Sequence, residues 1–183
     1  MSVKNIVRMS MLCGLLSFPI TTYAGPGTIV FACVYLQTKP LKPITFHFKI
    51  SGTHCMTYSG ATEKDLVVHD VGPSCVEIGY IEKKASSSGG DVCATDENRW
   101  VLGYTATNHD KPETYTGSTG AKITGGMLWW PNSMELYAPS PGTTLCTSDA
   151  GCDNQRQDWD VGKQGPVVIQ FRPGTVKTDP PKK

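Results

Sequence analysis

The stretch ITFHFKI, residues 44–50, alternates apolar and polar residues without interruption. In an extended strand successive side chains point to opposite faces, so its four large apolar residues share one face and its threonine, histidine and lysine share the other. Such alternation is typical of an antiparallel strand with one face on a core and one face in solvent. The stretch therefore predicts a half-buried β-strand.

Outward from this stretch, the chain repeats the same design of short apolar segments separated by turn residues. Further strands are predicted at 28–36, 65–69, 75–81, 100–105, 127–130, 134–137 and 166–172. The separators are rich in Gly, Ser, Pro, Asn and Asp, and no segment keeps a helical period over three turns. The pattern predicts an all-β protein, an antiparallel β-sandwich or barrel in a single domain stapled by disulfides.

The start of the chain predicts a secretory signal peptide. Lys4 and Arg8 form a basic start, and residues 9–20 form an apolar run. Thr22 and Ala24 put small residues at the minus-three and minus-one positions of a cleavage site. Cleavage after Ala24 would send the protein to the periplasm or the extracellular medium.

Cleavage there divides the chain into a signal peptide over 1–24, one β domain over 25–174 and a disordered polar tail over 175–183. Of the 183 residues, 159 remain, which suits a single domain with a sizeable core. The signal carries two of the 17 basic residues, so 15 basic residues stand against 16 acidic ones. This near balance of charge gives no indication of a nucleic-acid partner. No later segment approaches the roughly 20 apolar residues of a transmembrane helix.

Six cysteines remain after the signal peptide. An even number in an exported chain predicts three disulfides, and the absence of close C-x-x-C pairs disfavours a zinc site. Pairing by order along the chain gives the expected bridges Cys33–Cys55, Cys75–Cys93 and Cys146–Cys152. With every cysteine oxidised, none is available as a thiolate nucleophile.

The segment GGMLWWPNSMELY sets Trp129 and Trp130 side by side before a proline. If 127–130 and 134–137 form a hairpin around a turn at 131–133, the two rings point to opposite faces. One interpretation is an ordinary core hairpin that is covered on both sides. The other is an exposed aromatic platform, because flat rings stack on sugars and anchor protein partners.

The functional hypothesis takes the second interpretation. Trp129, Trp130 and Tyr137 would present an aromatic surface to a glycan or to a partner protein. Trp159, between two aspartates, would either anchor its loop on the core or extend that surface. Asn154 and its acidic neighbours would add hydrogen bonds around the rings.

The segment CTSDAGCDNQRQDWD, residues 146–160, is predicted to be a polar loop closed by a disulfide. Its carboxylates are Asp149, Asp153, Asp158 and Asp160. Clustered aspartates supply oxygen ligands for calcium, but their spacing does not match the EF-hand loop. A solvated loop is the preferred interpretation, calcium is the alternative, and no other cofactor is expected.

The sequence contains no motif for catalysis. A G-x-S-x-G elbow does not occur. The glycines at 117–120 and 125–126 lack the lysine and the following helix of a phosphate loop and are predicted to be turns. The His-Asp steps at 69–70 and 109–110 lack the H-x-H spacing that would put two metal ligands on one strand face. Binding is therefore favoured over enzymatic activity.

Two alternatives remain open at this point. A periplasmic inhibitor or immunity-type protein would plug a target protein with the tight loop between Cys146 and Cys152. A secreted hydrolase would need carboxylates or histidines brought together from distant strands. A glycan binder should depend on its tryptophans, whereas a plug should depend on its loop.

Overall fold

A computed structural model describes residues 27–83, 93, 98–108, 113–124, 132–147, 151–159 and 166–173. In chain order the strands are β1 (Gly27–Leu36), β2 (Ile44–His54), β3 (Met56–Ser59), β4 (Glu63–Val68), β5 (Gly72–Lys83), β6 (Asn98–Asn108), β7 (Glu113–Thr124), β8 (Asn132–Tyr137), β9 (Thr143–Thr147), β10 (Gly151–Asn154), β11 (Arg156–Trp159) and β12 (Val167–Phe171).

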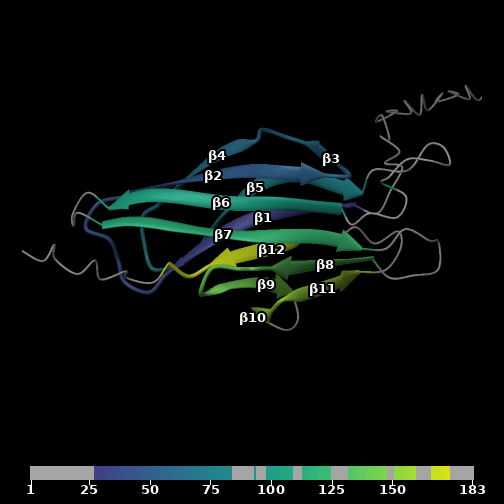
Figure 1. Cartoon of the computed structure of the whole chain (residues 1–183). Coiled ribbons are helices and arrows are strands. Elements are labelled where there is room, and N and C mark those ends of the chain that lie inside the picture. The colour runs from purple at the N-terminus through teal and green to yellow at the C-terminus, as the bar shows by residue number, and fades with distance from the viewer. Residues whose placement is uncertain are drawn as a thin grey trace, which may run out of the picture.

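The strands form two sheets that pack face to face (Figure 1). The first sheet has the order β10-β9-β12-β1-β5-β3, and the second sheet has the order β11-β8-β7-β6-β2-β4. Neighbouring strands are antiparallel except β1 and β12, which are parallel. The predicted all-β class is confirmed, and the architecture is a sandwich rather than a closed barrel. Within the described ranges, no helix has the length and apolar character needed to cross a membrane.

The core lies between the two sheets and is built from alternate residues of the strands. All four apolar residues of the 44–50 stretch are buried, which confirms the half-buried strand predicted there. Phe48 and Tyr104 of the second sheet contact Phe171 of the first sheet, with ring centroids 5.9 and 4.9 Å apart. These aromatic pairs hold the two sheets together, because such contacts stabilise beyond the area they bury.

Most of the apolar strands were predicted in place. The strands predicted at 28–36, 44–50, 65–69, 75–81, 100–105, 134–137 and 166–172 correspond to β1, β2, β4, β5, β6, β8 and β12. The strand predicted at 127–130 lies outside the described residues.

Five strands, β3, β7, β9, β10 and β11, were not predicted. Residues 117–120, predicted to be a turn, lie in the middle of β7, and the polar loop predicted over 146–160 contains β10 and β11. β3 has only four residues, and the other four strands are rich in Thr, Gly or acidic residues and lack an alternating apolar pattern. Their strand conformation comes from pairing with neighbouring strands, a tertiary effect that local propensity does not carry.

The hairpin predicted between 127–130 and 134–137 is wrong. β8 lies between β7 and β11 in the second sheet, so both of its sides are already paired. Asn132 and Ser133, predicted to form part of the turn, are the first two residues of β8 and pair with β11.

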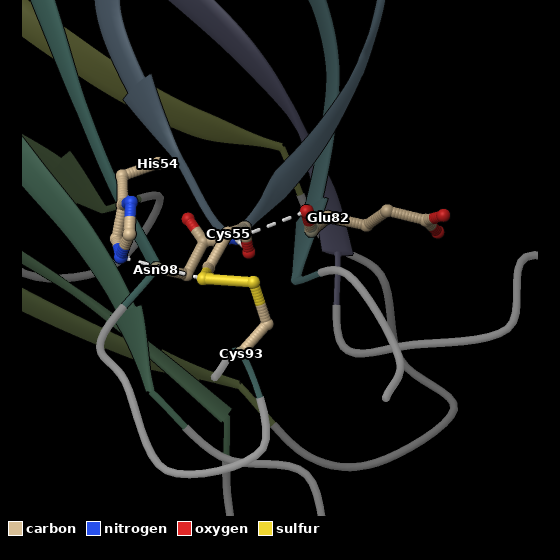
Figure 2. Close-up of a disulfide and its surroundings, with 5 residues drawn as sticks. All are labelled: His54, Cys55, Glu82, Cys93 and Asn98. Carbon is tan, nitrogen blue, oxygen red and sulfur yellow. Dashed lines mark hydrogen bonds between the residues drawn. A yellow bond between two sulfur atoms is a disulfide. The ribbon is translucent and has the colours of Figure 1, made fainter. Parts of the chain in front are cut away.

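The chain passes directly from one sheet to the other at both long edges of the sandwich. β2 of the second sheet leads into β3 of the first sheet through Cys55, whose φ is 50°, and β10 leads into β11 through Gln155. Figure 2 shows Asn98 beside the first of these crossings. Its amide nitrogen donates to the main-chain oxygens of Cys55 at 2.8 Å and Glu82 at 3.1 Å. One buried amide thereby joins the two sheets at this corner.

Three disulfides are present, as predicted. They are Cys33–Cys75, Cys55–Cys93 and Cys146–Cys152. The third pairing is confirmed, whereas the predicted Cys33–Cys55 and Cys75–Cys93 bridges are wrong. β1 pairs with β5, which places Cys33 directly opposite Cys75. Cys55 follows β2, which lies in the other sheet. Three disulfides are typical of a protein that folds in an oxidising compartment.

Candidate functional site

The outer face of the second sheet carries a concave site that is built from described residues. Along β6 the buried residues alternate with more exposed ones, so the odd-numbered residues from Arg99 to Thr107 turn away from the core. The registers of β2, β4, β7 and β8 bring the outward residues of those strands beside them. This face is therefore a continuous surface built by five neighbouring strands.

An open hollow of about 510 Å³ lies on this face around Gly103. Gly103 follows Val101 and precedes Thr105 along β6, and it stands between Lys49 of β2 and Ser118 of β7 across the sheet. All four of these residues line the hollow, and Gly103, which has no side chain, leaves its centre open. We call this site the Gly103 hollow.

Two cross-strand contacts, the Lys49–Glu63 ion pair and the His47–Asp65 hydrogen bond, form one wall of the Gly103 hollow. His47 Nδ1 lies 2.6 Å from Asp65 Oδ1, and Lys49 Nζ donates to Glu63 Oε1 at 2.7 Å. The hydrogen bond and the charge of Glu63 raise the pKa of Lys49. All four side chains are between 60% and 66% exposed, so these pairs add little to folding stability. Each pair engages one oxygen of its carboxylate, and the second oxygen is available to a ligand.

Gly103 differs in its surroundings from Gly27, Gly117 and Gly120, other strand glycines whose φ lies outside the left-handed region. A Cβ built on Gly27, Gly117 or Gly120 would come under 3.0 Å from a tyrosine side chain of a neighbouring strand. A Cβ built on Gly103 would meet its nearest atoms at 3.6 and 3.8 Å, which is ordinary contact, and its φ lies outside the left-handed region. Neither packing nor backbone conformation requires glycine at this position. Its effect is open space on the surface, as glycine provides in a strand where a ligand approaches closely.

Tyr137, one of the predicted site residues, lies on the same outer face. It stands opposite Gly120, which in turn stands opposite Val101 of the hollow. The ring of Tyr137 covers Gly120, and the side chain is half-buried. The structure thus places one predicted aromatic residue beside the Gly103 hollow.

Of the other predicted ligand-binding residues, Asn154 is the one whose side chain is described, and it lies in the first sheet. Asn154 pairs with Leu145 at the edge of the first sheet. Trp159 is the last residue of β11, and its side chain lies outside the described part of the structure, as do Trp129 and Trp130 entirely. Tyr137 is therefore the one predicted aromatic site residue whose side chain the structure describes, and it lies on this outer face.

The predicted acidic cluster is described only in part. Asp158 lies in β11, where Arg156 Nε donates to its Oδ1 at 2.8 Å. This bond raises the pKa of Arg156. Asp149, Asp160 and the side chain of Asp153 lie outside the described residues. Among the side chains that are described, no three His, Cys, Asp or Glu groups gather where they would hold a metal ion.

The sequence analysis missed the charged wall and the role of Gly103. Outward-facing His47 and Lys49 were visible in the alternation of the 44–50 stretch, and Glu63 and Asp65 alternate in the same way in β4. The register that places these residues opposite one another, and both beside Gly103, is set by strand pairing between distant segments. A glycine within the apolar segment at 100–105 was the one local signal available.

The Gly103 hollow does not contain a serine-hydrolase arrangement. His47 and Asp65 form a pair, but Ser51 lies about 13 Å from His47 along β2, and Ser118 is two strands away, about 10 Å at the usual spacing of strands. Both separations exceed hydrogen-bond reach, which a nucleophile and its base require. The groups that line the hollow are suited to holding a ligand.

Comparisons of the chain with protein-family models, with curated proteins and with solved structures find no match.

Proposed function

We propose that this protein is an exported binding protein that engages a glycan at the Gly103 hollow. The observation that carries the proposal is the hollow around Gly103, where neither packing nor backbone conformation accounts for the glycine. A residue with a side chain would stabilise the strand and close the space. Glycine at this position is therefore useful if a ligand occupies the space.

The chemistry around the hollow supports a sugar as the ligand. Charged groups on β2 and β4 and hydroxyls from Ser51, Thr105 and Ser118 offer many hydrogen-bond donors and acceptors in one concave place. The ring of Tyr137 lies alongside and offers a flat apolar surface. A sugar ring presents both hydroxyls and apolar C–H faces, and it matches this combination.

The predicted signal peptide and the three disulfides support export to the periplasm or the extracellular medium. An inhibitor that plugs a target is the competing proposal. It would use the hairpin of β9 and β10 closed by Cys146–Cys152, which lies at the edge of the first sheet. The two proposals therefore depend on different surfaces.

The test is a glycan-array screen of the oxidised protein beside Gly103→Val. Valine suits an exposed strand position, its Cβ makes only ordinary contacts at Gly103, and its methyl groups would project into the hollow. Thr57→Val is the matched control, because it puts the same side chain on an exposed position of β3 in the other sheet. We expect Gly103→Val to fold and to lose binding, while Thr57→Val binds as the wild type does.

Glycan binding that survives in folded Gly103→Val would contradict the proposal. A second variant tests the aromatic component. Tyr137→Ala should weaken binding roughly three- to tenfold, the range expected for one ring contact, and Tyr137→Phe should retain it. Absence of glycan binding in the wild type would shift the assignment to a protein partner.

A further inference from the structure

We propose that the Gly103 hollow selects uncharged, hydroxyl-bearing sugars and discriminates against acidic ones. This inference rests on the proposed function and concerns the class of glycan. Its basis is the way the charged wall is paired.

The side chains of Lys49 and His47 are already engaged by carboxylates. Lys49 bonds to Glu63 and His47 bonds to Asp65, and all four residues line the hollow. An acidic sugar that approached Lys49 or His47 would meet the oxygens of Glu63 or Asp65 at the same time. Like charges brought together at an interface are strongly unfavourable, so the carboxylates act against an anionic ligand.

A hydroxyl is the group that satisfies such a pair. It accepts a hydrogen bond from an ammonium and donates one to a carboxylate, whereas a sugar carboxylate only accepts and a sugar ammonium only donates. The pairs Lys49–Glu63 and His47–Asp65 lie two residues apart on the same strands, about 7 Å at the usual rise of a strand. The two pairs would therefore bind two hydroxyls of one ligand.

A second ion pair on the same outer face provides a control for the effect of net charge. Lys122 and Glu135 form an ion pair on the same outer face, with Nζ 3.3 Å from Oε2, and neither residue lines the hollow. Removing one carboxylate there changes the net charge of the protein by the same amount as removing Glu63. Glu135→Gln is thus a matched control for Glu63→Gln.

The experiment measures the affinity of the folded, oxidised full-length protein for a panel of neutral oligosaccharides and their uronic-acid, sulfated and amino-sugar counterparts. We expect neutral members to bind at least about tenfold more tightly than acidic ones. Glu63→Gln removes the negative charge beside Lys49 and should raise affinity for acidic members by about tenfold, and Glu135→Gln should leave the selectivity unchanged.

The outcomes separate this inference from the proposed function. A wild-type preference for acidic or amino sugars that Gly103→Val abolishes would overturn the inference and leave the glycan site in place. Equal gains for acidic members in Glu63→Gln and Glu135→Gln would assign the selectivity to net charge and also overturn it. Binding that Gly103→Val does not affect would overturn the proposed function and this inference together.

Discussion

The ring of Tyr137 covers Gly120, which stands directly opposite it across β7 and β8. The same relationship recurs on the core face, where Tyr104 of β6 covers Gly117 of β7. β7 therefore receives one tyrosine from each neighbouring strand, one on each face of the sheet. Gly117 and Gly120 of β7 are thus each covered by a tyrosine ring. Gly103 of β6 differs, because the space above it is open.

Alanine at these three glycines should have graded effects on stability. Gly117→Ala should cost about 3 kcal/mol, because its methyl meets the ring of Tyr104, which is held in the aromatic core. Gly120→Ala should cost about 1 kcal/mol, because the ring of Tyr137 that its methyl meets is only half-buried. Gly103→Ala should be neutral or stabilising by up to about 1 kcal/mol. Denaturant unfolding of the oxidised variants checks this order, and equal losses at all three positions would refute it.

Loss of the Asn98 amide should weaken the corner between the sheets. Asn98→Ala leaves the main-chain oxygens of Cys55 and Glu82 without this donor in a buried place, which should cost about 2 kcal/mol. Gln155→Ala is the control at the opposite crossing, because the Gln155 side chain also bonds across to Thr143 but is exposed. The cost of Gln155→Ala should stay below about 1 kcal/mol, because water replaces the lost donor at an exposed position. Similar free energies of unfolding for both variants would remove the special role assigned to Asn98.

The three disulfides should contribute unequally. Their residues are separated by 42, 38 and 6 positions for Cys33–Cys75, Cys55–Cys93 and Cys146–Cys152. Loop-closure entropy predicts about 4 kcal/mol for each of the two long bridges and about 2 kcal/mol for the short one. Paired serine variants compared by thermal unfolding test the order. A larger loss from the short bridge than from either long one would contradict the entropic account.

Alkaline pH should destabilise the fold through Tyr104. Burial raises the pKa of its phenol from 10.0 to about 12, so between these values the unfolded chain loses a proton that the folded protein keeps. The associated stability is present below pH 10 and falls as pH rises toward 12, by on the order of 2 to 3 kcal/mol. Tyrosinate absorbance titrations of the wild type and Tyr104→Phe isolate this group. A difference curve with its midpoint near 10 would show that Tyr104 is not protected.

Several features followed from local sequence because they depend on which face of a strand meets the core. The alternation at 44–50 predicted β2, and the continuous apolar run at 28–36 predicted β1 in the middle of the first sheet. β7 was missed for the opposite reason. This segment of glycines and threonines forms a strand because the rings of Tyr104 and Tyr137, from the strands on either side, pack over its glycines.

The sequence by itself determined the all-β class, the position of the half-buried strand at 44–50 and the presence of three disulfides, since alternation and cysteine number are local properties. The tertiary structure alone decided that β1 pairs with β5, which joins Cys33 to Cys75. It also decided that the wall formed from β2 and β4 meets the open position at Gly103. The physical reason is that register between strands far apart in the chain is set by the packing of two whole sheets, and no single segment carries that information.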